Sequence, residues 1–233
     1  MKILVTSGST QMPIDKVRCL TNIFKGKTGT VIALQAALDG HEVTLIANQS
    51  IDKLRYMHPD VLFGKLCFKT IPYNTFDELE QIMKKEITTG IYDVVIHSAA
   101  VSDYQVTIVT SEIKDLEWWE RQPYGTFVER ESKIPSGKIT YLGLEPTKKL
   151  VDEIRKSWDF KGKLVKFKLQ VDMSDEELLE IAKKSRATSD ADFIVANCLE
   201  WSKSRAYIVD RNDNVESVDR SSLAKRLICE VSK

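Results

Sequence analysis

Four short polar segments of the sequence each follow an apolar run and could take part in chemistry. They are Ser7 to Asp15, Ser98 to Tyr104, Lys168 to Asp172, and Asn197. The first contains Ser7-Gly8-Ser9-Thr10, whose flexible backbone and hydroxyl groups could bind a phosphate. A tight turn followed by a helix cap explains the same residues about equally well.

Asn22 is a further candidate, because an amide can stabilise a developing oxyanion by donating a hydrogen bond. It lies in "VRCLTNIFKG", residues 17 to 26, between a first strand and a helical stretch. A connection of this kind needs only a few polar residues. The structural alternative is that Asn22 caps the helix that follows.

The elements that would position these residues alternate along the chain. Strand-like apolar runs occupy residues 2–6, 42–47, 66–71, 92–100, 163–169 and 192–197. Helices are predicted at 29–40, after the capping-box residues Thr75 and Ser174, and at about 221–231. This alternation predicts an α/β fold with a doubly wound, mostly parallel, Rossmann-like sheet and helices on both faces. Ligands of such sheets bind beyond the carboxyl ends of the strands, where the polar segments lie.

The length of 233 residues suits one domain, residues 1–233. Residues 105–140 interrupt the alternation with "EWWERQPYG" and "SKIPSGK". We therefore expect a small inserted segment there, β-rich or irregular.

Composition narrows the range of partners and compartments. Lys plus Arg equals Asp plus Glu at 34 each, which indicates neither nucleic acid nor a membrane surface as a general partner. The four cysteines show no spacing typical of zinc or disulfides, and no 18-residue apolar run is present. We expect a soluble cytoplasmic protein. His41, His58 and His97 lack ligand spacing and are assigned no catalytic role.

A nicotinamide-dependent reductase is the first function to consider, because "VTSGST" is similar to the start of short-chain reductases. The G-x-G-x-x-G fingerprint is absent, however, and the second strand ends in Asn48-Gln49 without an acidic residue for a ribose. None of the seven tyrosines has a lysine four residues later. This function is therefore the less favoured alternative.

The motifs "SGSTQMPIDKVRCLTN", "IHSAAVSDY", "KFKLQVD" and "DFIVAN" occur in an order that resembles phosphopantothenoylcysteine synthetase, the ligase of coenzyme A biosynthesis. The resemblance covers most of the chain and indicates the short stand-alone bacterial form, which lacks the decarboxylase domain.

This resemblance implies a reaction and its partners. The ligase joins 4′-phosphopantothenate to L-cysteine, with CTP as co-substrate, ATP as an alternative, and Mg²⁺. The carboxylate attacks the α-phosphate to give an acyl-cytidylate and pyrophosphate, and the cysteine amine then displaces CMP. The resemblance also implies a homodimer, with residues 105–140 as the candidate contact, and a separate phosphopantothenoylcysteine decarboxylase in the same pathway.

The resemblance also implies site residues. Asn22 would hold the acyl-nucleotide, and Arg18, one helical turn before it, would help to bind the charged substrate. The other substrate-binding residues would be Gly8, Ser9, Thr10, Asp15, Ala99, Ala100, Asp103 and Tyr104. The nucleotide would contact Ser98, Phe167, Lys168, Asp172, Lys184 and Asn197, with Asp172 also the metal ligand. Turns, caps and solvated charges are the structural alternatives for several of these residues.

The chain also departs from the family pattern. Ile23-Phe24-Lys25 replaces residues that usually include two hydroxyls, and Lys25 could substitute for them with a charge. Lys183, Lys184 and Arg186 stand near the positions of the usual flap lysines. Two hypotheses follow, an active ligase or a diverged paralogue that binds nucleotide or phosphopantothenate-like ligands without ligating them.

Overall fold

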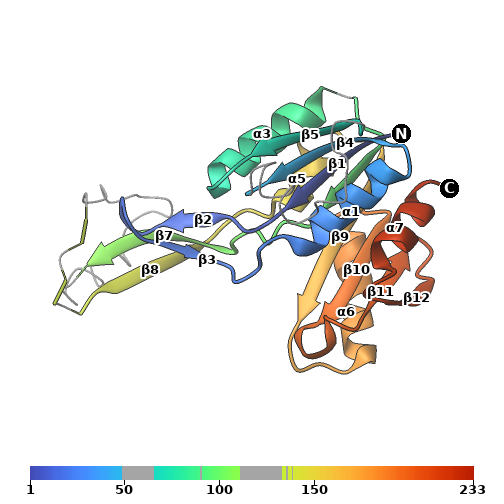
Figure 1. Cartoon of the computed structure of the whole chain (residues 1–233). Coiled ribbons are helices and arrows are strands. Elements are labelled where there is room, and N and C mark those ends of the chain that lie inside the picture. Colours follow the sequence, from blue (N-terminus) through green and yellow to red (C-terminus); the bar gives the residue numbers. More distant parts are fainter. Residues whose placement is uncertain (49–65, 90, 111–132, 135, 138) are drawn as a thin grey trace.

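A computed structural model of the chain describes residues 1–233 except 49–65, 90, 111–132, 135 and 138 (Figure 1). Within the described residues, eight strands form one sheet in the order β12-β11-β10-β9-β6-β1-β4-β5. Their bounds are β1 Lys2–Ser7, β4 Glu42–Ala47, β5 Phe68–Pro72, β6 Val94–His97, β9 Lys163–Gln170, β10 Phe193–Cys198, β11 Arg205–Asp210 and β12 Val215–Asp219. The strands from β5 to β10 are parallel, and β11 runs antiparallel. The predicted doubly wound α/β fold is confirmed.

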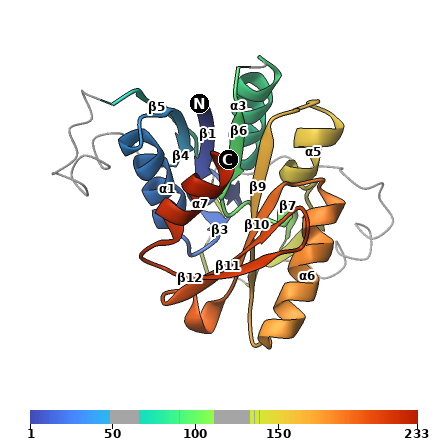
Figure 2. The ribbon, with the colours of Figure 1, turned by 90° about the vertical axis from the view of Figure 1, so that its right-hand side faces the viewer.

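Helices cover both faces of the sheet (Figure 2). The helices α1, Lys27–Leu38, and α7, Leu223–Val231, pack on one face. The other face carries α3, Phe76–Thr88, α5, Leu150–Lys156, and α6, Asp175–Thr188. Side chains of β1 alternate between the two cores, because successive residues of a strand point to opposite faces.

Two helix caps predicted from the sequence are present in the structure, and a third possible cap is not. Thr75 and Ser174 each form a complete capping box with a glutamate three residues later, as predicted. The residue that precedes α1, however, is Gly26, with φ of 77°, and not Asn22. The structural alternative, in which Asn22 caps this helix, is therefore ruled out.

Three antiparallel pairs of strands are not located by the sequence prediction. The antiparallel strands β11 and β12 extend the sheet through a turn that contains Asp213 at φ of 63°. A separate arm projects from the body (Figure 1) and consists of β2 Gln11–Pro13, β3 Cys19–Thr21, β7 Tyr104–Thr110 and β8 Tyr141–Pro146. The strand β7 occupies the first residues of the predicted insertion at 105–140 and β8 directly follows it, while most of the insertion lies outside the described residues.

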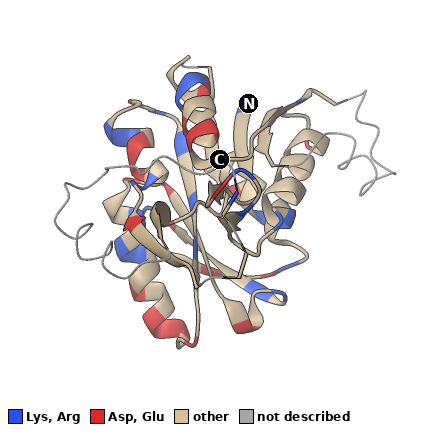
Figure 3. Cartoon of the chain, turned by 90° about the vertical axis from the view of Figure 1, so that its left-hand side faces the viewer, with Lys and Arg blue, Asp and Glu red and all other residues tan. Residues whose placement is uncertain are grey.

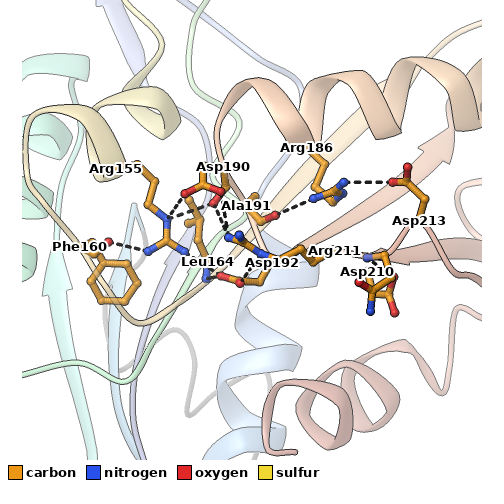
Figure 4. Close-up of polar contacts among 11 residues, drawn as sticks. Arg155, Phe160, Leu164, Arg186, Asp190, Ala191, Asp192, Asp210, Arg211 and Asp213 are labelled. Carbon is orange, nitrogen blue, oxygen red and sulfur yellow. Dashed lines mark hydrogen bonds and ion pairs between the residues drawn. The ribbon is translucent and has the colours of Figure 1, made fainter.

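A network of charged side chains joins α5, β9, β10 and β11 (Figure 4). Asp192 accepts hydrogen bonds from Arg155 Nη2 at 2.7 Å, from Leu164 N at 2.8 Å and from Arg211 Nε at 3.0 Å. Arg155 also donates to the carbonyl of Phe160. One carboxylate therefore neutralises two guanidinium groups and satisfies a strand N–H, which fixes α5 against the sheet.

Asp192→Asn should destabilise the fold, because it removes the nearest carboxylate of Arg155 and one of the two that pair with Arg211, which leaves Asp190 as their remaining counter-charge. We expect the free energy of unfolding to fall by about 2–3 kcal/mol in denaturant titrations. The matched control is Asp159→Asn, in an ion pair whose side chains are more than three-quarters exposed. Asparagine tolerates its positive φ, so this change should stay within about 0.5 kcal/mol. Equal losses in both variants would contradict the role of the network.

Candidate active site at the strand ends

A cavity of about 1380 Å³ lies at the carboxyl ends of β6, β9 and β10, beside the loop that follows β1. From β1 the sheet continues to β4 in one direction and to β6 in the other, so the cavity lies where the strand order reverses. Open α/β sheets bind their ligands at this position.

The walls of the cavity come from both faces of the sheet. On the α1 side lie Thr28, Phe167, Asn197 and Arg220. On the α5 and α6 side lie Lys149, Asp152, Lys166 and Ser189, which come from these two helices and from β9.

Ser7 and two glycines shape the loop on the α1 side. The Ser7 hydroxyl donates to the carbonyl of Gly26 at 2.6 Å and lies 3.2 Å from the Thr30 hydroxyl. A Cβ on Gly26 would stand 2.5 Å from the backbone nitrogen of Gly8. Gly26 is therefore needed both for its positive φ and for this close approach.

Thr6 organises the loop that follows β6. Its Oγ1 accepts a hydrogen bond from Ala99 N at 3.1 Å and lies 2.9 Å from His97 Nδ1. The Ser98 hydroxyl donates to the Thr6 carbonyl at 2.6 Å. Burial, and then the charge of Lys166, lower the pKa of His97 to about 4, so its imidazole is neutral at pH 7.

Positive charge dominates the cavity lining. Eight Lys or Arg side chains line it, namely Lys25, Lys27, Lys148, Lys149, Lys166, Lys168, Lys203 and Arg220. The acidic lining residues are Asp103 and Asp152. Elsewhere, basic and acidic residues are interspersed over the helices (Figure 3) and balance in the whole sequence. The cavity is therefore suited to ligands that carry several negative charges.

Lys166 is buried in the α5 and α6 wall. Its Nζ donates to Ser189 Oγ at 2.5 Å and to the Ser185 carbonyl at 3.0 Å, and the Ser189 hydroxyl donates to Asp152 at 2.6 Å. Burial lowers the pKa of Lys166 to about 8 against the opposing effect of Asp152, and Lys168 and Lys149 lower it further. His97, its register partner on β6, carries no compensating charge.

Half of the predicted site residues line this cavity. They are Gly8, Ser98, Ala99, Ala100, Asp103, Phe167, Lys168 and Asn197. Asp103 lies at the open side, where Lys149 Nζ donates to its carboxylate at 2.5 Å.

Asn22 and Arg18 lie outside the lining, in the segment that joins the arm to α1. The Asn22 side chain is exposed, and its Nδ2 donates to the Ala100 carbonyl at 3.0 Å. Arg18 does not stand one helical turn before it, because Cys19–Thr21 form strand β3. Asn22 therefore lies beside the 99–101 loop, whereas Arg18 belongs to the β2–β3 hairpin.

Asp15 is a buried partner of Arg18 within that hairpin. Its carboxylate accepts hydrogen bonds from the N–H of Ile134 at 3.0 Å and from Arg18 Nη2 at 2.6 Å. These two contacts hold the pKa of Asp15 below its usual range. Oδ1 accepts from the N–H groups of Val17 and Arg18, so both oxygens of Asp15 are held within the hairpin, and its predicted substrate contact stays a prediction.

Ser9 and Thr10 are likewise buried and connect two loops. Thr10 Oγ1 accepts from Ser102 N at 2.8 Å, and Ser9 Oγ accepts from the Thr21 hydroxyl at 3.1 Å. These contacts hold the arm against the 98–103 loop.

The remaining predicted residues are exposed and also lie outside the lining. Tyr104 begins β7, Lys184 lies on α6, and Asp172 follows β9 with φ of 52°. Arg186, the third substitute for the flap lysines, is buried and pairs with Asp213 at 3.0 Å. No group of three or more His, Cys, Asp or Glu residues forms a metal site within the described residues.

Several lining residues are missing from the sequence prediction. Lys166, Ser189 and Asp152 meet only when β9, α5 and α6 pack together. His97 was assigned no role, yet it lines the cavity because it is the last residue of β6. The sequence alone could have indicated Lys166, because this residue interrupts an apolar strand on the same face as Leu164.

Comparison with known proteins gives a consistent result. Residues 1–116 match the family model described as "DNA/pantothenate metabolism flavoprotein C-terminal domain". All of this chain aligns at 31% identity with the Coenzyme A biosynthesis bifunctional protein CoaBC of Thermococcus kodakarensis, of which it covers 51%. The chain thus spans about half the length of that relative.

Two solved structures share the fold. The DNA/pantothenate metabolism flavoprotein from Streptococcus pneumoniae has a TM-score of 0.76 at 27% identity, over 100% of this chain and 98% of that chain. The C-terminal domain of a CoaBC protein has a TM-score of 0.69 at 21% identity, over 99% and 93% of the two chains.

The mostly parallel sheet, with a cavity where its strand order reverses, defines a Rossmann-like α/β protein. Within that class, the chain is similar to CoaBC proteins of coenzyme A biosynthesis and to a DNA/pantothenate metabolism flavoprotein, and the resemblance predicted from its motifs is confirmed. No helix within the described ranges is long and apolar enough to cross a membrane.

The buried charge of Lys166 predicts a pH dependence of stability. Its pKa of about 8 lies below the ordinary value of 10.5, so above pH 8 the unfolded chain binds more protons at this group than the folded protein does. Stability should therefore rise by about 1–2 kcal/mol between pH 7.5 and 9.5, and Lys166→Met should abolish the rise.

The control is Lys163→Met at the other end of β9, whose Nζ donates to the Val231 carbonyl. This variant should keep the rise. Denaturant titrations should stop at pH 9.5. The pKa values of Tyr73 and Tyr92 are raised above the ordinary 10.0, so at higher pH the unfolded chain loses these protons before the folded protein does and stability falls. An unchanged slope in Lys166→Met would refute the assignment.

Proposed function

We propose that this chain is a phosphopantothenate–cysteine ligase of coenzyme A biosynthesis. It joins 4′-phosphopantothenate to L-cysteine with CTP through an acyl-cytidylate, and it releases CMP and pyrophosphate. Kinship to CoaBC proteins supports the pathway. A solved Cab2 variant of the same fold is described as a complex with phosphopantothenate-cysteine, which is the product proposed for this chain.

The observation that carries this proposal is the excess of positive charge in the cavity. Its substrates would bring a phosphate, a carboxylate and a triphosphate together, and these repel one another. Eight cationic side chains line the cavity against two carboxylates, and although Glu80 pairs with Lys148, the remaining excess of positive charge would offset that repulsion. Phe167 and Asn197 on the α1 side are available to a nucleotide, and the 98–103 loop to the acid substrate.

Asn22 would act at the edge of the site. Its amide already donates to the Ala100 carbonyl, which directs the side chain toward the loop proposed to hold the acyl group. The same nitrogen makes a longer bond of 3.5 Å to the Val101 carbonyl, which its second N–H could exchange for the developing oxyanion. Ile23 and Phe24, which follow it, line the cavity.

Magnesium would bind mainly to the triphosphate, because Mg²⁺ in nucleotide sites commonly takes one or two protein carboxylates together with phosphate oxygens. Asp172 is the predicted carboxylate, and among the described residues it belongs to no group of three or more possible metal ligands. A homodimer and a separate decarboxylase remain part of the proposal.

Pyrophosphate release tests the ligase against the diverged paralogue. Protein mixed with phosphopantothenate, CTP and Mg²⁺ should release at most one pyrophosphate per site without cysteine and should turn over when cysteine is added. Replacing CTP with ATP tests the choice of base. Tight substrate binding without pyrophosphate release would favour the paralogue.

Asn22→Asp should lower turnover roughly 100-fold, because it replaces an oxyanion donor with a negative charge. Stability should change little, since the side chain is exposed and does not cap α1. Asn22→Ala separates loss of the donor from the added charge, and Asn212→Asp in an exposed turn is the charge-matched control. Full turnover in Asn22→Asp would exclude a catalytic role.

Asp172→Asn should raise the Mg²⁺ concentration needed for half-maximal activity by roughly 10-fold, because a carboxylate is the better ligand for a hard cation. Glu180→Gln, on the exposed face of α6, is the control. An identical Mg²⁺ titration for Asp172→Asn and the parent would remove Asp172 from the metal site.

A further inference from the structure

Arg220 enters the cavity from the C-terminal part of the chain. It lies in the turn between β12 and α7, where its backbone N–H donates to the Ser204 carbonyl at 2.8 Å. Its guanidinium crosses to α1 and donates from Nη2 to the Thr28 hydroxyl, 192 residues away in the sequence. Contacts at both ends of the residue therefore fix its position in the wall.

The guanidinium of Arg220 has no carboxylate within ion-pair distance among the residues that the structure describes. A guanidinium has five N–H donors, and the Thr28 hydroxyl receives only one of them. Burial lowers the pKa of Arg220, so the site disfavours the charge that the side chain must keep. An anion bound in the cavity would offset this cost.

Arg226 on α7 shows the usual arrangement for comparison. Its guanidinium pairs with Glu216 at 2.5 Å and with Glu230 at 2.9 Å, and it does not line the cavity. The two arginines lie six residues apart, and of the two Arg220 is the one that faces the cavity without a counter-charge.

We propose that Arg220 binds a phosphoryl group of the nucleotide substrate. This assignment rests on the proposed ligase function and adds a binding residue to it. The α1 side of the cavity favours the nucleotide, because Phe167 and Asn197 lie on that side. A planar guanidinium can donate two parallel hydrogen bonds to phosphate oxygens, and the Thr28 contact orients it in advance.

The test is calorimetric binding of CTP, CDP, CMP and cytidine to the parent and to Arg220→Gln. We expect Arg220→Gln to weaken CTP binding roughly 10- to 100-fold and to leave cytidine unchanged. Arg220→Lys should recover part of the affinity, because it keeps the charge and loses the two-pronged geometry. Arg226→Gln is the matched control and should bind CTP as the parent does.

Phosphopantothenate is titrated in parallel, since it is the other source of a phosphate. If Arg220→Gln weakens phosphopantothenate binding and leaves CTP binding intact, the assignment to the nucleotide is wrong. If the parent binds CTP and Arg220→Gln binds it equally well, the role of Arg220 is refuted while the ligase proposal stands. A parent protein that binds neither CTP nor ATP overturns the ligase proposal and the Arg220 assignment together.

Thermal melting of each variant shows whether a loss of binding reflects unfolding. Thr28→Val provides a second variant, because it removes the tether and keeps the guanidinium. Its CTP affinity should fall by a smaller factor than that of Arg220→Gln. A larger fall would place the binding role on Thr28 and overturn the assignment.

Discussion

The carboxyl end of β1 carries the hydrogen bonds on which the cavity depends. Thr6 holds the loop after β6 through Ala99 and His97, and Ser7 holds the segment before α1 through Gly26. Both strand residues are buried, so each hydroxyl needs a partner inside the protein. The loops close around this strand end because they supply those partners, and the cavity forms between them.

The cost of the site lies in its charges. Lys166 is buried and Arg220 is half-buried, each without a carboxylate in direct contact, on opposite sides of the sheet. In the network around Asp192, by contrast, each guanidinium has a carboxylate partner. The protein therefore neutralises charge where helices must stay fixed and leaves it uncompensated where an anion is proposed to bind.

The sequence predicted the fold well, because local patterns encode most of it. Thr75 and Ser174 marked helix starts that the structure confirms, and the apolar runs located five of the six parallel strands within a few residues and the sixth, β6, inside a longer run. Positions set by tertiary contact were not encoded locally. Asn22 was a possible helix cap because a helix follows it in the sequence. In the structure, Gly26 lies against the backbone of Gly8 and the helix starts at Lys27. Arg220 meets Thr28 only through tertiary packing, so no local pattern indicated it, and Lys166 interrupts an apolar strand without revealing that Ser189 would be its partner.

The contacts around Thr6 also bear on how the protein folds. Thr6 and His97 are 91 residues apart, and Ser98 reaches the Thr6 carbonyl across 92. Arg220 reaches Thr28 across 192 residues. The Thr6 contacts can form as soon as β1 pairs with β6, whereas the Arg220 contact closes the longest of these loops and costs the most loop-closure entropy. The wall of the cavity that contains Arg220 is therefore complete only when the turn before α7 packs against α1.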